Sequence, residues 1–355
     1  MSKVSIKDIA KKADVSIGTV DRVLHNRGQV ADTTKKKVLK VAEDLQYKPN
    51  LLARSLASRK DLNLAVLLPK ASGPDEYWYA PVIGMRRALE ELKDHGIKLR
   101  KHLFNLYDKS DFLTAATNML KQAELDGIIL APFYYDTFKN MLQERGYADV
   151  PCVLIDSRSG DDGEEISVAQ NSYRSGRVAA ELMLRSIPQH RAVGVVDINA
   201  SKLRIPTMKQ RSRGFVSYIQ DHCKQIEIKN IIIDQKDLSS PRQKLLDTIG
   251  TLAGLYVTTS RVWQIIDMLK PIHHNLPFII GYDLLTPNLN YLKQGEIKYL
   301  IGQRPELQGY YAMQEIVSHL MSRDDNRQSI NIPIDIITAE NFEMYTSFQT
   351  QKTIV

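Results

Sequence analysis

Features typical of secreted, membrane and disulfide-rich proteins are scarce in this chain of 355 residues. It has only two cysteines, Cys152 and Cys223, which are too few for a disulfide framework or a thiolate metal site. Its longest apolar runs, such as residues 64–68, fall far short of the ~20 residues that span a bilayer. The first residues lead into charged, amphipathic sequence rather than into the apolar segment of a secretory signal. We therefore expect a cytoplasmic protein with no membrane part.

The sequence motifs of common enzyme classes are missing as well. No Gly-x-Gly-x-x-Gly follows a strand, and there is no Walker-type loop, His-Glu-x-x-His or nucleophile elbow. The eight histidines are scattered, and the pair His273-His274 does not have the spacing of a metal site. The sequence thus predicts no catalytic residues, no metal and no cofactor.

Positive charge is present in excess, and it is concentrated at one end. The chain has a formal net charge of +7, whereas residues 1–60 alone carry fourteen Lys or Arg against six Asp or Glu. The rest of the chain is therefore close to neutral. This distribution is typical of a polyanion-binding module joined to a separate domain, although a lysine-rich solvated face gives the same charge.

Helical periodicity organises this basic segment. Ser5–Asp8 has capping-box spacing before a first apolar face, and Asp14 is a residue type that tolerates a left-handed turn. Ser16 can cap a second helix over residues 17–24, and Asp32 or Thr33 can cap a third. Any small three-helix domain shares this periodicity, but the short turn at residues 13–16 together with the basic surplus favours a helix-turn-helix.

From residue 62 onward, short β-rich runs alternate with amphipathic stretches, which predicts doubly wound parallel sheets. The expected strands are residues 62–68, 98–104, 127–131, 152–155, 192–197, 228–233, 255–257, 278–281 and 298–301. Helices are expected between them, for example at residues 79–95, 112–123, 173–186, 208–221 and 306–321. This number of strands requires two sheets.

Several motifs in the first sixty residues resemble the headpiece of the lactose-repressor (LacI/GalR) family of transcription regulators. They are Val4–Ala10, Ala13–Ser16, Thr19–Val23 and Tyr47–Asn50, in the family's order and spacing. In such proteins the second helix enters the major groove of DNA. The resemblance implies that Ile17, Gly18 and Arg22 meet base edges, and that Ser16, Thr19, Asn26 and Arg27 lie near phosphates. For Arg22 a phosphate contact is the alternative, and for Ile17 a core position. Asp21 departs from the family's usual serine, and we do not count it as a DNA contact.

Residues 47–60 resemble the family's hinge helix. The pattern includes Asn50, Ala53 and Leu56, and the resemblance implies a helix that forms when two copies meet on the operator. Leu56 would then enter the minor groove between base steps and bend the duplex, with Ala53 allowing close approach. A role in linker packing is the alternative for Leu56. This hinge implies a homodimer on a near-palindromic operator. Leu56→Ala is then expected to weaken operator binding while leaving non-specific binding.

The remaining chain resembles the effector-binding part of the same family, which shares its fold with periplasmic sugar-binding proteins. Motifs in matching order are residues 171–176, 210–215, 280–283 and 303–309, with chain crossings between lobes near 157–170, 301–304 and 330. The implied effector contacts are Trp78, Phe133, Asp156, Asn171, Arg211, Asp283 and Gln303. Asp156 and Asp283 have helix capping as the alternative role, and Phe133 a core position.

The expected fold is thus an all-α helix-turn-helix headpiece followed by a two-lobed α/β effector domain of the type I periplasmic-binding-protein kind. The expected divisions are residues 1–46, a hinge at 47–60, an effector and dimerisation domain at 61–345, and a polar tail at 346–355. The expected function is a repressor controlled by a small molecule, with a sugar as the first guess. A solute-binding protein with a non-specific basic segment is the rival. Arg211→Ala is expected to abolish the ligand response while leaving DNA binding intact.

Overall fold

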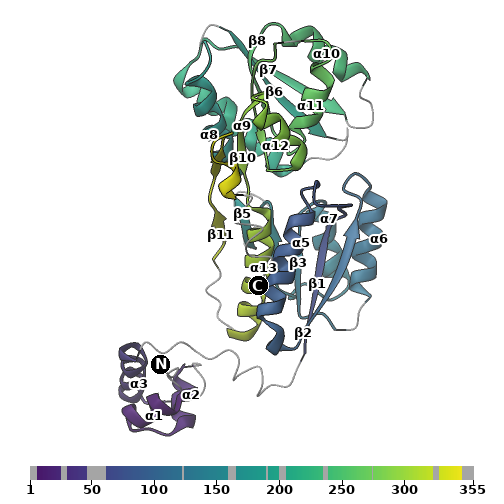
Figure 1. The fold of residues 1–355 in the computed structure, drawn as a ribbon. Coiled ribbons are helices and arrows are strands. Elements are labelled where there is room, and N and C mark those ends of the chain that lie inside the picture. Colours follow the sequence, from purple (N-terminus) through teal and green to yellow (C-terminus); the bar gives the residue numbers. More distant parts are fainter. Residues whose placement is uncertain are drawn as a thin grey trace. The chain divides into compact units, whose positions relative to one another are not determined.

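The computed structural model of the chain describes residues 6–24, 30–45, 61–121, 124–158, 165–188, 191–199, 205–234, 239–273, 275–322 and 328–345. The chain divides into two compact units, Met1–Lys60 and Asp61–Val355. The first unit is all-α and the second is α/β, so the predicted fold class is confirmed (Figure 1).

Three helices form the described part of the first unit: α1 (Ile6–Ala13), α2 (Ile17–Leu24) and α3 (Asp32–Asp44). Their apolar faces meet in a small core, which buries Ile9, Ala10, Ala13, Val20, Val23, Val38 and Ala42. The apolar residues of each helix recur at three- and four-residue spacing, so each helix presents one face to this core.

The turn between α1 and α2 follows the sequence prediction. Asp14 has a φ of 52°, and the hydroxyl of Ser16 accepts a hydrogen bond from the Thr19 amide at 3.0 Å. The third helix differs slightly, because it begins at Asp32 rather than after an Asp32 or Thr33 cap. The carbonyl of Ala31 already accepts from the amide of Thr34 at 2.9 Å, which starts the helix one residue earlier than expected.

Two sheets make up the second unit, as predicted, and each has six strands. The first sheet, in lobe 1, has the order β11-β5-β4-β3-β1-β2, and all its described strand pairs are parallel. The second sheet, in lobe 2, has the order β12-β10-β9-β8-β6-β7 and is parallel except at β10–β12.

The strands of lobe 1 are β1 (Leu62–Pro69), β2 (Ile97–Phe104), β3 (Gly127–Leu130), β4 (Cys152–Ile155), β5 (Ile166–Gln170) and β11 (Ile330–Ile332). Those of lobe 2 are β6 (Ala192–Asn199), β7 (Ile228–Asp234), β8 (Leu252–Val257), β9 (Phe278–Tyr282), β10 (Ile297–Gly302) and β12 (Asp335–Ile337).

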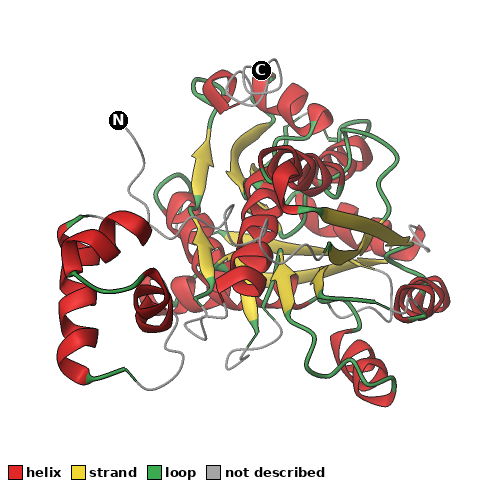
Figure 2. Ribbon diagram, turned by 90° about the horizontal axis from the view of Figure 1, so that it is seen from below, coloured by secondary structure: helices red, strands yellow, loops and turns green. Residues whose placement is uncertain are grey.

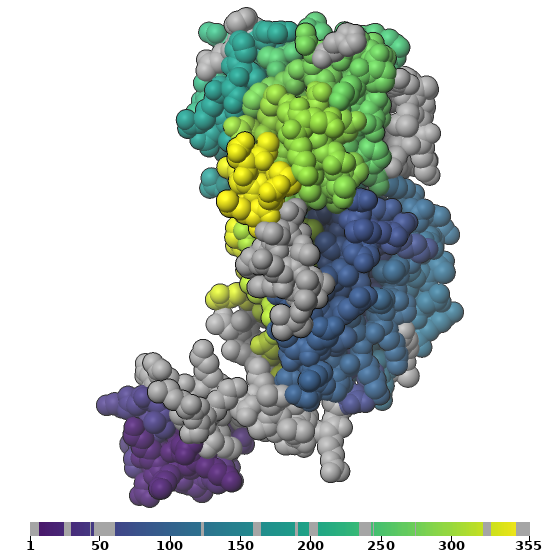
Figure 3. Space-filling model, in the orientation of Figure 1, coloured from purple at the N-terminus to yellow at the C-terminus, as the bar shows by residue number. Residues whose placement is uncertain are grey.

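Helices cover the sheets of both lobes, as Figure 2 shows with helices in red beside the yellow strands. Lobe 1 contains α5 (Tyr79–Glu91), α6 (Lys109–Leu120), α7 (Tyr135–Glu144) and α13 (Pro305–Ser322), with a 3-10 turn at Lys93–His95. Lobe 2 contains α8 (Ser172–Leu184), α9 (Pro206–His222), α10 (Ser239–Ile249), α11 (Val262–Leu269) and α12 (Thr286–Lys293). One apolar core fills lobe 1, and two apolar cores fill lobe 2. In Figure 3 the first strands and helices of lobe 1 are blue and lobe 2 is teal to green.

The chain passes between the lobes at three places, and one of them differs from the prediction. The first crossing follows Gln170 rather than lying within residues 157–170, because β5 pairs with both β4 and β11 in the sheet of lobe 1. The second crossing follows β10, after which α13 packs against α5 in lobe 1. The third joins β11 to β12. The strands β5, β11 and β12 were not predicted, and β11 and β12, with three residues each, are too short to show a period.

Candidate functional site

The start of α2 forms an exposed surface in the first unit. Ile17 is 44% exposed, so it does not have the core position that was its alternative. Gly18 and Arg22 are exposed next to it. A Cβ built on Gly18 would have only the Ser16 hydroxyl within 4 Å, at 3.8 Å, so this part of the surface is open. An approaching surface can therefore reach the helix backbone here.

Ser16 and Thr19 have a structural role on the same surface. The Ser16 hydroxyl caps α2, and the two hydroxyls lie 2.8 Å apart. Both side chains thus fix the start of the helix that carries the exposed residues. The other DNA contacts implied by the resemblance, Asn26, Arg27, Asn50, Ala53 and Leu56, lie outside the described residues.

A cavity of about 370 Å³ lies between the two lobes of the second unit. Its walls come from the carboxyl ends of strands in both sheets, where open α/β sheets bind ligands. Six of the seven predicted effector contacts line it: Trp78, Phe133, Asp156, Arg211, Asp283 and Gln303. Its volume is within the ~300–1,000 Å³ that is typical of small-molecule sites.

Arg211, on α9, is the most enclosed cation of the cavity, with 4% of its surface exposed. Its Nη1 donates to the carbonyl of Thr258 at 2.7 Å, and its Nη2 donates to the side-chain carbonyl of Gln303. The guanidinium also lies 3.9 Å from the centre of the Tyr282 ring. Its Nε is buried and has no hydrogen-bond partner among the described residues. These contacts orient a planar donor group toward the cavity.

Asp283 extends this network from the end of β9. Its Oδ2 accepts from Gln303 Nε2 at 2.7 Å, whereas its Oδ1 is buried without a partner among the described residues. Burial raises the pKa of Asp283 to about 7, although the charge of Arg211 opposes this shift. The next helix, α12, begins at Thr286 without a side-chain cap, so Asp283 does not have the capping role that was its alternative.

Asp156 lies at the equivalent position in lobe 1, after β4. Its Oδ1 accepts from the Tyr77 hydroxyl at 2.7 Å, and its amide donates to Gln308 Oε1 at 2.8 Å. Burial raises the pKa of Asp156 too, with Arg211 and the Tyr77 hydroxyl acting in the opposite direction. Asp156 and Asp283 have positive φ values of 70° and 66°, a strained conformation that is frequent at functional sites.

Aromatic side chains form the wall in lobe 1. Trp78 precedes α5, as predicted, and its ring packs edge-to-face on Phe133 with the centroids 5.6 Å apart. Phe133 belongs to the apolar core and also lines the cavity, so its two proposed roles coexist. An apolar wall beside polar groups suits a ligand with one apolar and one polar face.

Asn171 is placed elsewhere. Its side chain caps α8 by accepting from the Arg174 amide at 2.9 Å, and it lines a second cavity of about 380 Å³. Arg158 lines the same second cavity and donates to Asn331 at 3.0 Å.

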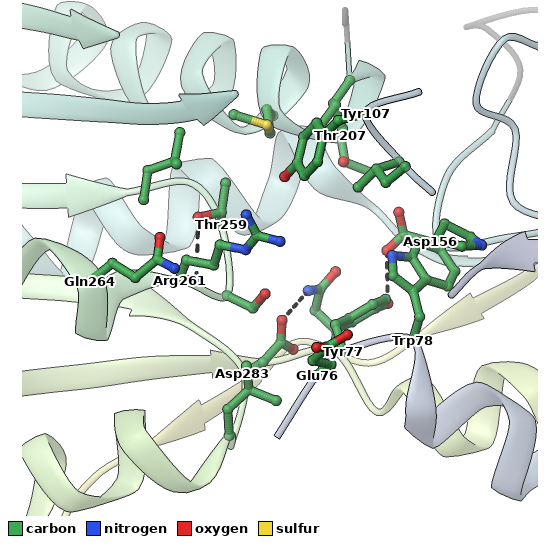
Figure 4. Close-up of a pocket in the computed structure, with 18 of the residues that line it drawn as sticks. Glu76, Tyr77, Trp78, Tyr107, Asp156, Thr207, Thr259, Arg261, Gln264 and Asp283 are labelled. Carbon is green, nitrogen blue, oxygen red and sulfur yellow. Dashed lines mark hydrogen bonds between the residues drawn. The ribbon is translucent and has the colours of Figure 1, made fainter. Parts of the chain in front are cut away.

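Several residues of the first cavity were not found from the sequence. They include Tyr77, Tyr107, Thr207, Arg261 and Gln264. Arg261 lies just after the carboxyl end of β8, where open α/β sheets bind ligands, and this position is the signal in the sequence that could have identified it. Figure 4 shows Arg261, Thr259 and Gln264 on one side of the cavity, and Tyr77, Trp78 and Asp156 on the other. The cavity thus offers fixed hydrogen-bonding groups around a space that is partly open to solvent, which is an arrangement for binding.

No helix in the part of the chain that the structure describes is both long and apolar enough to cross a membrane.

Two family models match the chain. The model described as bacterial regulatory proteins, lacI family, matches residues 5–50, and the periplasmic binding protein domain matches residues 65–324. The first match covers the described helix-turn-helix, and the second covers most of both lobes.

Named relatives and solved structures agree with these models. The transcriptional regulator RegA of Clostridium saccharobutylicum is 32% identical over 182 residues, about half of each chain (51% of this one and 52% of RegA). The ribose operon repressor of Bacillus subtilis is 28% identical, over 82% of this chain and 86% of the repressor. A solved structure from Bacteroides fragilis, assigned as a LacI transcriptional regulator, superposes with a TM-score of 0.71 at 28% identity. It covers 81% of this chain and all of that one. The relatives named here are regulators of transcription.

Proposed function

The chain belongs to the lacI family of bacterial regulatory proteins, and we propose that it is a repressor whose affinity for its DNA operator is controlled by a small molecule. The single observation that carries the proposal is that a DNA-binding type of unit and a ligand-binding type of cavity occur in one chain. The chain has an exposed α2 surface on a helix-turn-helix, and it also has a cavity between two lobes that is lined by polar groups. We further propose a homodimer, a near-palindromic operator, a cytoplasmic location and a binding rather than catalytic role for the cavity.

The α2 surface supports binding in the major groove of DNA. Arg22 is exposed on the same helix as Ile17 and Gly18, and a guanidinium can donate two hydrogen bonds to a guanine edge. Ile17 supplies an apolar contact for a thymine methyl group. The surplus of basic residues in this unit favours binding to phosphates without regard to sequence. Asn26, Arg27, Asn50, Ala53 and Leu56 remain part of this proposal on the family resemblance alone.

The cavity supports control by a sugar or a sugar derivative. Arg211 and Asp283 offer a donor and an acceptor in lobe 2, while Trp78 and Asp156 lie in lobe 1. A ligand that contacts both lobes stabilises the arrangement of the lobes in which it makes all of these contacts. The ligand changes DNA affinity only if the protein in this arrangement binds DNA more tightly or more weakly than the ligand-free protein.

Selection of genomic DNA fragments by the purified full-length protein tests the proposal. We expect a near-palindrome that is bound ~10³-fold or more tightly than random duplex, with affinities measured over a salt titration. If nothing is enriched and binding only weakens with salt, the first unit is a non-specific polyanion-binding segment and the proposal is wrong.

A matched pair of variants then tests the role of α2. Arg22→Gln is expected to weaken operator binding about 5- to 150-fold, corresponding to ~1–3 kcal/mol, while binding to random duplex changes little. Arg145→Gln removes the same charge from an exposed position after α7 and is expected to leave operator binding unchanged. Equal losses of Arg22→Gln on operator and random DNA would instead indicate a phosphate contact.

A further inference from the structure

Arg261 contributes a second guanidinium to the cavity, at the junction of the lobes. It directly precedes α11 in lobe 2, and its guanidinium lies 5.4 Å from the centre of the ring of Tyr107, which follows β2 in lobe 1. Figure 4 shows the side chain of Arg261 extending into the cavity beside Thr259. Any group bound to Arg261 therefore lies where the two lobes face each other.

The charge of Arg261 is not matched by the protein. Its Nη1 is buried and has no hydrogen-bond partner among the described residues, and no described carboxylate forms an ion pair with it. A buried donor on a charged group is destabilising if it stays unpaired. An acceptor from a ligand, best an anionic one, removes that cost.

Two other buried polar atoms of lobe 2 require a different ligand group from Arg261. The Oδ1 of Asp283 is buried without a partner among the described residues and can accept a hydrogen bond or, when protonated, donate one, while the Nε of Arg211 needs an acceptor. A hydroxyl group is both donor and acceptor, so neighbouring hydroxyls on one ligand satisfy both atoms. The aromatic wall of Trp78 and Phe133 suits the apolar face of a sugar ring.

The carboxylates of the walls disfavour a ligand that carries more than one negative charge. The lining residues include four carboxylates, Asp75, Glu76, Asp156 and Asp283. They include three cations, and one of these, Lys70, is already paired with Asp111 at 2.8 Å. A phosphate ester brings about two negative charges at neutral pH, which these carboxylates repel.

We propose that the cavity selects a monosaccharide-sized polyhydroxy carboxylate, whose carboxylate binds Arg261 and whose hydroxyls bind Arg211 and Asp283. Arg261 is then the residue that distinguishes the acid from the parent sugar. A neutral sugar fills the same space but leaves the Arg261 Nη1 without an anion. The inference rests on the proposed function only in taking this cavity as the effector site.

Calorimetry on the full-length protein without DNA tests this inference. The probes are pairs that differ only at one carbon, D-galactose with D-galacturonate and D-glucose with D-glucuronate, together with glucose 6-phosphate. We expect at least one acid to bind ~10-fold or more tightly than its parent sugar, which corresponds to ~1.4 kcal/mol. The inference is overturned if the parent sugars or the phosphate ester bind more tightly, or if neither acid binds at up to ~10 mM.

Variants assign the preference to Arg261. Arg261→Gln is expected to weaken binding of the acid ~10-fold or more and to leave the parent sugar unchanged, and Arg261→Lys is expected to lie between. Arg145→Gln is the matched control for loss of one positive charge. An unchanged affinity of Arg261→Gln for the acid contradicts the inference. If a neutral sugar rather than an acid releases the operator, the inference about Arg261 is wrong and the proposed function stands. If an acid binds but does not change DNA affinity, the inference about Arg261 stands and the proposed control of DNA binding is wrong.

Discussion

Individual buried charges determine how the cavity behaves as pH changes. Asp283 is 2% exposed, and its pKa is raised to about 7 from the ordinary value of 3.8 by burial. The folded protein therefore holds a proton on this carboxyl between about pH 4 and 7, whereas the unfolded chain has released it. The folded state binds more protons in this window, so its stability falls as pH rises through it and levels off above pH 7.

This difference predicts the behaviour of Asp283→Asn. The amide keeps an acceptor for Gln303 but has no charge to bury, so the melting temperature of the variant relative to the parent should rise between pH 5 and pH 8. Asp156 also has a raised pKa, and its charge helps to raise the pKa of Asp283, so the difference between the two proteins reports the carboxyl pair rather than Asp283 alone. Thermal melts of the parent protein and of Asp283→Asn at pH 5 and pH 8 measure this difference in melting temperature. Asp136→Asn, at an exposed site in α7, is the control; an equal difference at both pH values for Asp283→Asn argues against the prediction.

At the scale of elements, close helix packing holds Arg211 in place. The helices α8 and α9 meet through two glycines: a Cβ on Gly176 would lie 2.0 Å from the carbonyl oxygen of Arg211, and one on Gly214 would lie 2.0 Å from that of Tyr173. Neither contact leaves room for a methyl group, and the obstructing atoms are backbone. A pair in lobe 1, Gly84 and Gly309, packs α5 against α13 in the same way.

We therefore expect Gly176→Ala to separate α8 from α9 and to displace Arg211 from Thr258 and Gln303. Overpacking of this kind costs ~1–3 kcal/mol, and ligand affinity should fall together with the melting temperature. Gly250→Ala is the matched control, because a Cβ on Gly250 has no atom within 4 Å. Melting curves and calorimetry check both effects. A Gly176→Ala protein with unchanged ligand affinity would show that the position of Arg211 does not depend on this contact.

At the scale of the whole molecule, the cavity includes groups from both lobes, so ligand binding and lobe arrangement are linked. Tyr77 and Asp156 come from lobe 1, and Arg211, Arg261 and Asp283 come from lobe 2. Three crossings join the lobes, so a change in their arrangement has to be accommodated at these segments. Coupling between two sites of one protein is reciprocal in free energy.

For the selected operator and the tightest-binding sugar or sugar acid, we expect saturating ligand to change operator affinity about 5- to 150-fold. Saturating operator should change ligand affinity by the same factor, which is an internal control. Fluorescence anisotropy with labelled operator and calorimetry with the ligand measure the two sides. Random duplex should show no such change, and an equal effect on random duplex would mean that the ligand acts on charge rather than on operator recognition.

The sequence by itself determined those parts of the protein whose signals are local. Helix periodicity and the Ser16 cap fixed the helix-turn-helix, and alternation of strands with helices fixed two parallel sheets. Strand ends and family motifs pointed to Arg211, Asp156 and Asp283, because parallel strands end at one edge of their sheet. Only the tertiary structure decided that Arg261 faces Tyr107 from the other lobe, and that Asn171 caps α8 away from the cavity. These contacts depend on sheet order and on where the chain crosses between lobes, and segments as short as β5 and β11 do not reveal those crossings in their own sequence.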